Sequence, residues 1–494
     1  MKYISTRTNT QKAETSAYAI KTGLASDGGL FMPESIPALT DDELRTLMGD
    51  NYPTRAAKIL SKFLTDYTYE ELLEDAYGAY SEEKFGEHPA PVTTLDENTY
   101  MLELWHGPTC AFKDMALQIM PRLFTRALKK CGEDKTALIL VATSGDTGKA
   151  ALEGYRDIKG TKIKVFYPVH GVSRVQKLQM QTQEGTNVSV SGIVGNFDDA
   201  QNGVKRIFSD AKMRDALLER SVFLSSANSI NWGRLVPQIV YYVSAYCDMV
   251  NSGAISFGDS IDVCVPTGNF GNIFAGYIAK KMGLPIEKLV CASNKNNVLT
   301  EFLRTGVYDR NRDFFATISP SMDILISSNL ERLLYLTLGQ EKTSEYMKSL
   351  SETGKYEIAK EELALINENF VGYYTDEENT KQTICKTFNE KNRLIDTHTA
   401  VAVYSAETYM HDSEAERKIL VVSTASPYKF ASDVYTAVSG KTPTDELSAL
   451  SELEAFTGVK TPAPLSSLSA KQIIHTETID KKDMDTATLT FAGA

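Results

Sequence analysis

Short apolar runs alternate with glycine-containing turns and helical patterns through most of the chain. Runs rich in aliphatic and β-branched residues predict strands at 137–143, 162–168, 187–192, 261–266, 288–293 and 418–424. Each run is followed by a turn and by an amphipathic pattern with the spacing of a helix. Strands that alternate with helices in this way are typical of a mostly parallel sheet. The pattern therefore predicts an α/β fold from about residue 100 onward.

The two ends of the chain carry different patterns. In the first 95 or so residues, the apolar positions of TDDELRTLM and YEELLEDAYGAY recur at helical spacing, and Thr40 or Asp41 is placed to cap a helix. The last 50 or so residues combine an acidic helical stretch, DELSALSELEAF, with the segment TPAPLSSLSA. We expect a mostly helical lead-in and a closing C-terminal arm.

The composition and net charge of the chain limit the classes of partner that it is expected to bind. The chain has 494 residues, of which 42% are hydrophobic and 23% charged, and its formal net charge is -12. This charge repels nucleic acid and anionic lipid at long range, so neither is an expected partner. The sequence has no apolar run long enough to span a membrane, and its polar start, MKYISTRTNTQKAETS, lacks the apolar stretch of a signal peptide. We therefore expect a soluble, cytoplasmic protein.

The cysteines are scattered along the sequence. They form no C-x-x-C pair, and the histidines do not cluster at metal-binding spacing. The sequence therefore predicts neither a metal site nor a disulfide framework. The cysteines are Cys110, Cys131, Cys247, Cys264, Cys291 and Cys385.

Junctions between strands and helices are the first places to look for chemistry, because open parallel sheets bind ligands at the carboxyl ends of their strands. The first junction, VATSGDTGKAALEGY, contains Ser144, Gly145, Asp146 and Thr147. Its glycines allow close backbone approach, and the two hydroxyls can donate hydrogen bonds. It is not a Walker A loop, because Thr143 stands where the first glycine would be needed. A capped glycine turn would explain the segment equally well.

The second junction, VCVPTGNFGNIFAGY, places a glycine-containing loop between a strand and a helix. Successive N–H groups in such a loop can enclose a dianionic phosphate without a lysine. A tight turn would use the same glycines, so the pattern alone leaves both interpretations open. The loop residues are Gly268, Asn269, Phe270, Gly271 and Asn272.

The third segment, AFKDMALQIMPRLFTRAL, has an apolar face that predicts one helix with Lys113 in its first turn. Pro121 should kink this helix or lie where its missing N–H matters little. A lysine in apolar surroundings has a depressed pKa, and its neutral amine can attack an aldehyde. A surface lysine whose stem packs on apolar groups is the alternative.

A fourth segment, HGVSRVQKLQMQTQEG, places Ser173 and Gln176 at the spacing of a capping box. Arg174 and Lys177 share one helical face near its start, where two cations could hold a phosphate. Solvated surface helices show the same pattern.

Taken together, these segments resemble threonine synthases of the bacterial and fungal type. The matching segments follow the expected order from about residue 103 to 430: HGPTCAFKD, ATSGDTGKA, VSRVQKLQM, NFDDAQ, NSINWGRLVPQ, PTGNFGNIFAGY, SPSMDIL, DTHTAVA and STASPYKF. TSAYAIKTGLASDGGLFMPESIP resembles the N-terminal domain of that family, and FTGVKTPAPLSSL resembles its C-terminal portion. The resemblance therefore covers nearly the whole chain.

This resemblance implies a fold-type II pyridoxal-phosphate enzyme with the tryptophan-synthase-β-like fold. Residues 1–95 would form the N-terminal domain, residues 96–435 the cofactor-binding catalytic region, and residues 436–494 a C-terminal arm. The catalytic region would divide into a smaller α/β subdomain, at about 135–230, and a larger one formed by 96–134 with 231–435. Both would contain open, mostly parallel sheets.

The resemblance also implies roles for single residues. Lys113, in AFKD, corresponds to the lysine that carries pyridoxal 5'-phosphate (PLP) as a Schiff base. The loop 268–272 corresponds to the cradle of the cofactor phosphate. Thr424, in STASPYKF, corresponds to the hydroxyl residue bonded to the pyridine nitrogen, and a neutral hydroxyl cannot stabilise a pyridinium as an aspartate would.

For the substrate, the loop from Ser144 to Thr147 resembles the one that receives the carboxylate. Arg174 and Lys177 are the candidates for clamping the departing phosphate. Related enzymes often have asparagine where this chain has Asp146, so the role of that residue stays open.

The expected reaction converts O-phospho-L-homoserine and water to L-threonine and phosphate by γ-elimination and β-addition of water. A related PLP lyase, either a dehydratase or an O-phosphoserine lyase, is the alternative, as is a non-catalytic protein on the same fold. A nicotinamide-dependent dehydrogenase is disfavoured, because no G-x-G-x-x-G follows a strand with an acid about 20 residues later. We expect a monomer or a weak homodimer.

Overall fold

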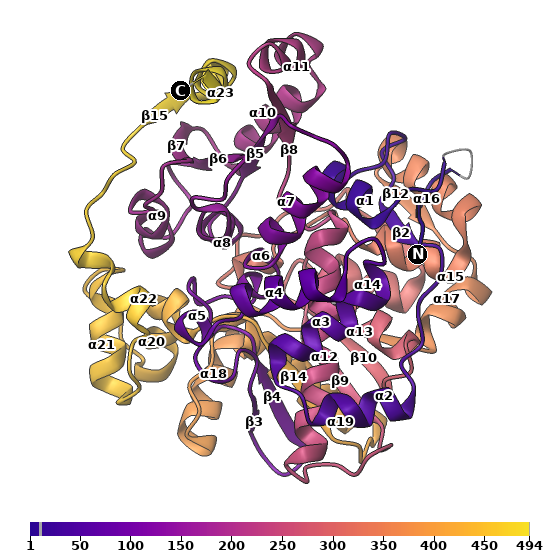
Figure 1. The fold of residues 1–494 in the computed structure, drawn as a ribbon. Coiled ribbons are helices and arrows are strands. Elements are labelled where there is room, and N and C mark those ends of the chain that lie inside the picture. Colours follow the sequence, from indigo (N-terminus) through magenta and orange to yellow (C-terminus); the bar gives the residue numbers. More distant parts are fainter. Residues whose placement is uncertain (9–11, 494) are drawn as a thin grey trace.

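The larger parallel sheet collects strands from distant parts of the chain (Figure 1). The computed structural model describes residues 1–8 and 12–493. The strand order is β13-β10-β9-β14-β4-β3, and neighbours are parallel except for β3 and β4. The central strands β9 and β14 are buried throughout, which explains why their sequences are largely apolar rather than alternating. The strands are β3 (Val92–Thr94), β4 (Thr99–Glu103), β9 (Ile261–Pro266), β10 (Ile286–Ser293), β13 (Phe370–Tyr374) and β14 (Ile419–Ser423).

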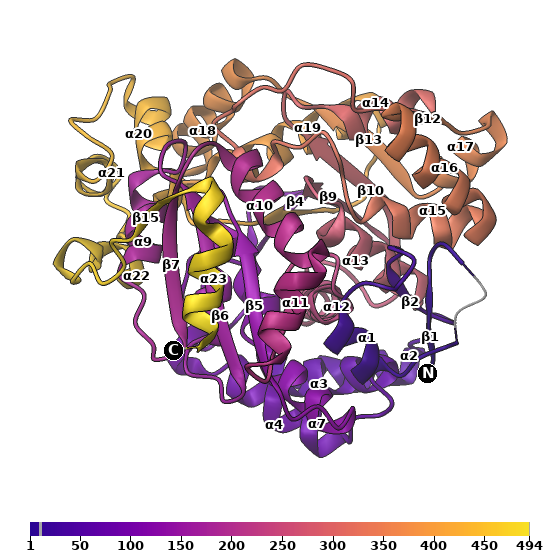
Figure 2. The same ribbon diagram turned by 90° about the horizontal axis from the view of Figure 1, so that it is seen from above.

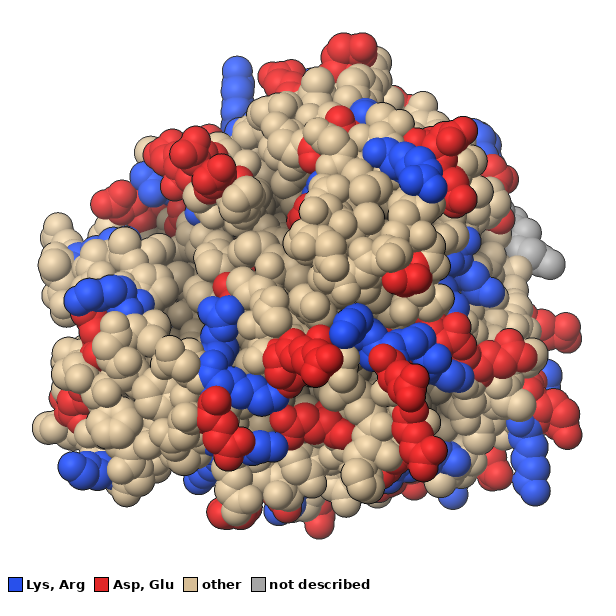
Figure 3. Space-filling model, turned by 90° about the horizontal axis from the view of Figure 1, so that it is seen from below, with Lys and Arg blue, Asp and Glu red and all other residues tan. Residues whose placement is uncertain are grey.

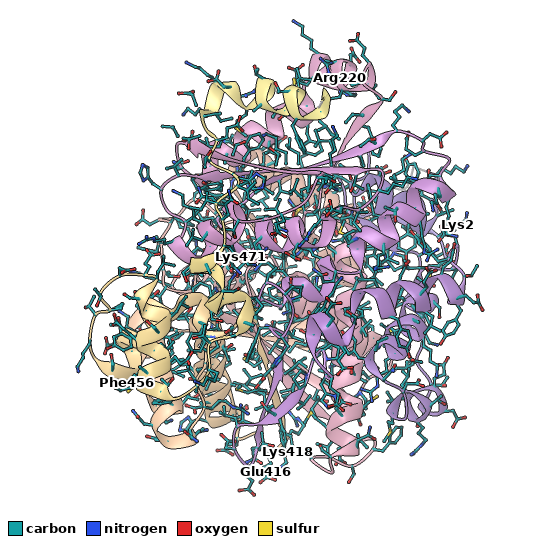
Figure 4. The ribbon with its side chains drawn as sticks, turned by 60° about the vertical axis from the view of Figure 1, so that its left-hand side comes forward. Lys2, Arg220, Glu416, Lys418, Phe456 and Lys471 are labelled. Carbon is teal, nitrogen blue, oxygen red and sulfur yellow. The ribbon has the colours of Figure 1, made fainter. Side chains whose placement is uncertain are left out.

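The smaller sheet is parallel throughout, with the order β15-β7-β6-β5-β8. Its strand β15 comes from the C-terminal segment, which runs along the outside of the protein to reach β7 (Figure 1). Figure 4 labels Lys471 where this segment leaves the C-terminal helices. The strands are β5 (Thr136–Ala142), β6 (Thr161–Pro168), β7 (Val188–Val194), β8 (Val222–Ser225) and β15 (Thr478–Asp480).

The predicted α/β fold is confirmed. Each predicted strand is present, and its ends lie within two residues of the predicted ones. Strands such as β4, β8 and β13 were not predicted, because each has at most five residues and shows no clear period. They add to the sheets without changing their parallel character.

The lead-in is mostly helical, as predicted, and also contains the antiparallel strands β1 (Tyr3–Ser5) and β2 (Phe31–Pro33). Thr40, rather than Asp41, caps α2: its hydroxyl accepts from the N–H of Glu43, whose carboxylate accepts from the N–H of Thr40. The helices are α1 (Ser16–Thr22), α2 (Asp41–Met48), α3 (Tyr52–Phe63), α4 (Tyr69–Ala79) and α5 (Glu82–Phe85).

Helix α12 (Trp232–Asn251) joins the lead-in to the larger sheet. Most of its side chains are buried, because it packs on α2 and α3 on one side and on α13 on another. The other elements around this sheet are α13 (Gly271–Lys281), α14 (Val298–Thr305), β11 (Val307–Asp309), α15 (Leu330–Leu338), α16 (Gln340–Thr353), β12 (Lys355–Glu357), α17 (Lys360–Asn367), α18 (Glu377–Lys391), α19 (Thr397–Ser413) and α20 (Ala431–Ser439).

The smaller sheet is covered partly by the end of the chain. Helix α23 (Met484–Gly493) packs against α10 (Phe197–Ser209) and α11 (Ala211–Leu218), as Figure 2 shows from above. The predicted arm also contains α21 (Ser448–Thr457) and α22 (Ala463–Ser466). The arm thus supplies both a strand and a helix to the smaller sheet. The domain boundaries drawn from the sequence stay predictions.

The helix predicted around Lys113 is in fact two helices. α6 (Lys113–Leu117) ends before α7 (Met120–Lys130) begins, and Pro121 occupies the first turn of α7. Proline is tolerated there, because the first N–H groups of a helix have no intrahelical acceptor. The prediction of one continuous helix was therefore wrong, whereas the expectation that the missing N–H of Pro121 would matter little was right.

Charge on the surface is mixed. On the face shown in Figure 3, acidic and basic side chains are interspersed.

Within residues 1–8 and 12–493, none of the helices combines the length and the apolar character that crossing a membrane requires.

Gly154 tests how closely the helix that carries Lys113 is packed. A Cβ at Gly154, in α8 (Asp146–Tyr155), would lie 1.9 Å from the carbonyl oxygen of Leu117 in α6. Alanine normally stabilises a helix relative to glycine, but Gly154→Ala should lower the free energy of unfolding by about 1–3 kcal/mol because the backbones must separate. Urea denaturation checks this expectation. Gly49→Ala is the control, because its Cβ would meet only the Thr46 carbonyl oxygen at 3.7 Å; equal stability of the Gly154 variant and the parent would contradict the packing argument.

Candidate active site

Lys113 is the first residue of α6, and its side chain is only 11% exposed. The amine donates to the Ser321 hydroxyl at 3.5 Å and lies 3.8 Å from Asp146 Oδ2. Burial lowers the pKa of this amine, and the Asp146 carboxylate offsets part of the effect. Lys113 is therefore a buried lysine with an easily deprotonated amine, not a surface lysine.

In the loop between β5 and α8, glycine lets the backbone pass close to a neighbouring side chain. Gly145 has φ 150°, and a Cβ on it would lie 2.4 Å from the side chain of Gln176. The Thr143 hydroxyl accepts from the N–H groups of Gly145 and Gly148, each at 3.0 Å, and so fixes the turn. Ser144 is exposed and Thr147 is half-buried. The loop thus leaves these two hydroxyls accessible beside the start of α8.

Asp146, the first residue of α8, carries a buried carboxylate. Its Oδ1 lies 2.9 Å from the Lys429 amine and accepts from the Gln176 amide at 2.8 Å. Burial by itself raises the pKa of this carboxyl, but the charges of Lys429 and Lys113 outweigh burial and hold the pKa well below its usual range. Asp146 is therefore ionised at neutral pH.

Lys429 is a site residue that sequence reasoning missed. Its side chain is fully buried, and besides Asp146 it donates to Gln179 Oε1 at 2.5 Å. It lies in the 3-10 turn Pro427–Phe430, soon after Thr424 in STASPYKF. Its presence in that motif was the only signal, because its partner Asp146 belongs to a loop of the other sheet.

The loop between β9 and α13 combines strain with free donors. A Cβ on Gly268 would lie 2.7 Å from the Ser321 carbonyl oxygen. Phe270 has φ 61°, which is uncommon for a residue with a side chain, and its ring packs on Phe370 with centroids 5.6 Å apart. α13 begins at Gly271, and no side chain in the described part of the chain caps its first N–H groups. The Asn269 carbonyl oxygen accepts from the backbone N–H and side chain of Asn329, which holds the loop in place.

Asn272 completes this loop with an unusual hydrogen-bonding pattern. Its Oδ1 accepts from the hydroxyls of Tyr241 and Tyr242, both at 2.6 Å. Its Nδ2 is buried and has no hydrogen-bond partner among the described residues. An unpaired buried donor is costly. Together with the uncapped N–H groups of α13, this donor indicates a place for an anionic acceptor such as a phosphate.

Thr424 contacts the backbone of Phe112, the residue before Lys113. It follows β14, is buried, and its carbonyl oxygen accepts from the Phe112 N–H at 2.8 Å. Ala111 and Ala425 pair as an isolated bridge next to this contact. The segment before Lys113 is therefore fixed to the segment that carries Thr424.

Ser321 connects these parts, because its hydroxyl contacts Lys113 and its carbonyl oxygen packs on Gly268. The structure thus brings Lys113, Asp146, the loop 268–272 and Thr424 to one buried place. Each comes from the carboxyl end of a parallel strand or from the helix that follows it, as expected for an open sheet.

Arg174 and Lys177, by contrast, lie farther out. The Arg174 side chain is 59% exposed and lies 3.6 Å from Asp445, and Lys177 is half-buried. Both belong to α9 (Arg174–Gln181), which Ser173 caps by accepting from the Gln176 N–H at 3.2 Å. The return bond of the predicted capping box, from the Ser173 backbone N–H, is not formed between these two described residues; Gln176 Oε1 accepts instead from the Ser173 hydroxyl at 3.2 Å, and Gln176 Nε2 donates to Asp146.

A cavity of about 360 Å³ lies between α8, α9 and α22. Its lining includes Lys149, Glu153, Gln183 and Lys471, and it reaches the buried cluster at Gln179. In the described part of the chain, no group of His, Cys, Asp and Glu side chains is arranged to hold a metal ion.

Comparison with protein families assigns nearly the whole chain. Residues 2–80 match the family described as "Threonine synthase N terminus", and residues 86–425 match "Pyridoxal-phosphate dependent enzyme". Residues 399–465 match "Threonine synthase, C-terminal". The matched ranges follow the order expected from the sequence motifs.

Individual proteins give the same result. Human threonine synthase-like 1 is 42% identical over 436 residues, which cover 86% of this chain but only 58% of that longer protein. Threonine synthase of Pseudomonas aeruginosa is 37% identical over 456 residues, covering 90% of this chain and 92% of the relative. The crystal structure of PLP-bound threonine synthase from Brucella melitensis matches with a TM-score of 0.89 at 35% identity, covering 100% of both chains.

The pair formed by Asp146 and Lys429 makes a direct prediction about stability. Lys429→Met keeps most of the volume but removes the nearer of the two cations that face the buried Asp146 carboxylate, so the free energy of unfolding should fall by about 3–5 kcal/mol. The double variant Asp146→Asn/Lys429→Met should be more stable than Lys429→Met, because it buries no uncompensated charge.

Urea denaturation measures both variants. Lys460→Met is the matched control, because its ion pair with Glu454 is on the surface, with the lysine side chain 87% exposed, and should change stability by less than about 0.5 kcal/mol. A double variant less stable than Lys429→Met would contradict the assignment.

Proposed function

The chain belongs to the threonine synthase family, and from that premise we propose that it converts O-phospho-L-homoserine and water to L-threonine and phosphate. The observation that carries the proposal is the buried amine of Lys113, which contacts Ser321, a residue packed on Gly268 in the loop before α13, while the backbone of the preceding residue, Phe112, is bonded to Thr424. In the proposed function, this arrangement would supply an amine, a partner for the ring nitrogen and a cradle for the phosphate in one place.

The residues fit PLP, the cofactor of the matched family. When bound, PLP supplies an aldehyde carbon for an amine and a ring that draws electrons from the substrate's α-carbon. The lowered pKa of Lys113 favours the neutral amine that must attack this aldehyde. The N–H groups at Gly271 and Asn272, with the unpaired Asn272 Nδ2, would hold the phosphate.

Thr424 would face the ring nitrogen. Its hydroxyl is neutral, so it cannot stabilise a positive charge there as a carboxylate would. We infer that this residue moderates the electron demand on the substrate.

Lys113 would also carry the protons of the reaction. Once free, its amine would accept a proton from the α-carbon of the substrate and later one from the β-carbon. After phosphate leaves from the γ-carbon and the hydroxyl of water adds at the β-carbon, protons would return to the γ-carbon and the α-carbon. The Asp146 carboxylate, 3.8 Å away, stabilises the ammonium form between these transfers.

The anionic groups of the substrate need donors of their own. The hydroxyls of Ser144 and Thr147, with the N–H groups at the start of α8, suit a carboxylate. Arg174 and Lys177 are our candidates for the departing phosphate, because they lie on the helix whose Gln176 contacts Asp146.

The decisive assay compares possible substrates. Purified protein loaded with PLP should release threonine and inorganic phosphate in equal amounts from O-phosphohomoserine, and much less product from serine, threonine or O-phosphoserine. Chromatography of the amino acids and a phosphate assay measure this. Dehydration of serine or threonine, or phosphate release from O-phosphoserine, at a higher kcat/KM would favour a related lyase, and a protein that binds no PLP would favour a non-catalytic role.

Replacing Lys113 tests the central residue. Lys113→Ala should abolish both turnover and the visible absorbance that PLP gains when linked to an amine of the protein. Lys280→Ala is the control, because burial also lowers the pKa of Lys280, and its amine donates to the Glu287 carbonyl oxygen on another part of the protein. A yellow, active Lys113→Ala variant would overturn the assignment.

A cytoplasmic location and a monomeric or weakly dimeric state are part of the same proposal and rest on the sequence alone.

A further inference from the structure

The fold brings together two sequence motifs, SPSMDIL and DTHTAVA, and apart from Ser321 their residues have no role in the site described above. The first contains the 3-10 turn η1 (Pro320–Met322), and the second begins α19. The backbone N–H of Ser321 in the turn donates to Nε2 of His398 at 3.1 Å. Ser321 is also the residue whose hydroxyl accepts from Lys113.

This hydrogen bond fixes the protonation of the imidazole. A backbone N–H can only donate, so Nε2 of His398 must be the unprotonated nitrogen. Nδ1 lies 2.9 Å from Oδ2 of Asp396, which also accepts from the His398 backbone N–H. A carboxylate accepts, so Nδ1 carries the proton. His398 is thus a neutral imidazole whose tautomer is set by Asp396.

Other groups around His398 leave this arrangement intact. The imidazole is 3% exposed, and its ring centroid lies 4.7 Å from that of Phe430. The Thr397 hydroxyl lies 3.4 Å from Nδ1. The carboxylate of Asp396 is itself fully buried and accepts from the Thr399 N–H at 3.1 Å. Asp396 is therefore held in place by its own hydrogen bonds, and it in turn orients His398.

The turn has a second anchor on its other side. The Asn294 amide, at the end of β10, donates to Ser319 Oγ at 2.9 Å and to Asp323 Oδ1 at 2.8 Å. His398 holds Ser321 from α19, and Asn294 holds the two ends of the turn from β10. Between these anchors, the Ser321 hydroxyl points to the Lys113 amine while its carbonyl oxygen packs on Gly268.

We propose that Ser321 is a catalytic partner of Lys113, and that His398 is a positioning residue which acts through the Ser321 backbone. The Ser321 hydroxyl accepts one N–H of Lys113, and Asp146 faces the same amine from another side. With these directions occupied, the lone pair of the neutral amine is directed at the substrate. This inference rests on the proposed function, because it assigns Lys113 the proton transfers.

The first test exchanges the hydrogen-bond acceptor at position 398. In His398→Gln the amide oxygen can take the place of Nε2, whereas in His398→Asn it is too short to reach, and His398→Leu has no acceptor. We expect the leucine and asparagine variants to lose roughly 10²-fold in kcat, the effect of a misplacement of about 1 Å, with KM changed less than about twofold. The glutamine variant should recover most of the loss.

The exposed His411 supplies the control, because its side chain is 89% exposed and His411→Leu should leave kcat unchanged. Equal losses of kcat in the glutamine and leucine variants would overturn the positioning role. Such a result would mean that the protein needs the shape of the ring and not its hydrogen-bond acceptor. A leucine variant with unchanged kcat would overturn it as well.

The second test asks whether His398 acts through Ser321. Ser321→Ala removes the hydroxyl but keeps the backbone N–H, and it should lower kcat while the affinity of the apoprotein for PLP, followed by fluorescence quenching, stays within about threefold of the parent. In the Ser321→Ala background, His398→Leu should cost less than about threefold in kcat, because the group it positions is already gone. If the two substitutions lowered kcat by independent factors that multiply in the double variant, the proposal would be overturned.

The third test needs neither cofactor nor turnover. In apoprotein labelled with ¹⁵N-histidine and measured at pH 8, one buried histidine, lost in His398→Gln, should show a protonated Nδ1 and an unprotonated Nε2. A proton on Nε2 would overturn the arrangement. Because this measurement does not depend on activity, it separates a failure of this inference from a failure of the proposed reaction, which the substrate assay on the parent protein tests.

Discussion

Burial of the Lys113 amine beside a shared carboxylate is the constraint on which the site depends. Removal from water favours the neutral amine, and the Asp146 carboxylate favours the charged one. Asp146 lies 2.9 Å from Lys429 but 3.8 Å from Lys113. Since charge attraction falls with distance, Lys429 takes the larger share of the carboxylate's field. Lys113 therefore keeps a pKa below that of an exposed lysine, which suits an amine that must both gain and lose protons.

The same contacts hold the two sheets together. Asp146 starts the helix after β5 of the smaller sheet, whereas Lys429 and Thr424 follow β14 of the larger sheet. The close approach of Gly154 in α8 to Leu117 in α6 lies on the same boundary. Any movement of one sheet against the other would therefore change the surroundings of Lys113. Packing and chemistry are coupled here because the reactive groups themselves form the boundary.

Local patterns in the sequence were enough to predict six of the strands, the positions of the two glycine loops and the family. Continuous apolar runs mark buried parallel strands, and glycines mark the loops 144–148 and 268–272, because both signals arise within a few residues. Lys429 and His398 could not be found in this way. Each acquires its role from a partner that is distant in sequence, and a single sequence holds no record of such contacts. The break between α6 and α7 was missed for a related reason, because the apolar face continues across it.

The distribution of charge explains how the site could hold the phosphate of the cofactor and release the phosphate of the substrate. The cradle at the start of α13 has N–H groups and the Asn272 amide but no side-chain cation in its loop, so a bound phosphate would be held by fixed dipoles. Such dipoles are part of the backbone and cannot move away, which suits a group that must stay. Arg174 and Lys177 are flexible cations on a partly exposed helix, and Arg174 already has an alternative partner in Asp445. In the proposed reaction, these side chains can release the phosphate of the substrate and bind a surface carboxylate instead. The phosphate that must leave is therefore held by the contacts that are easier to break.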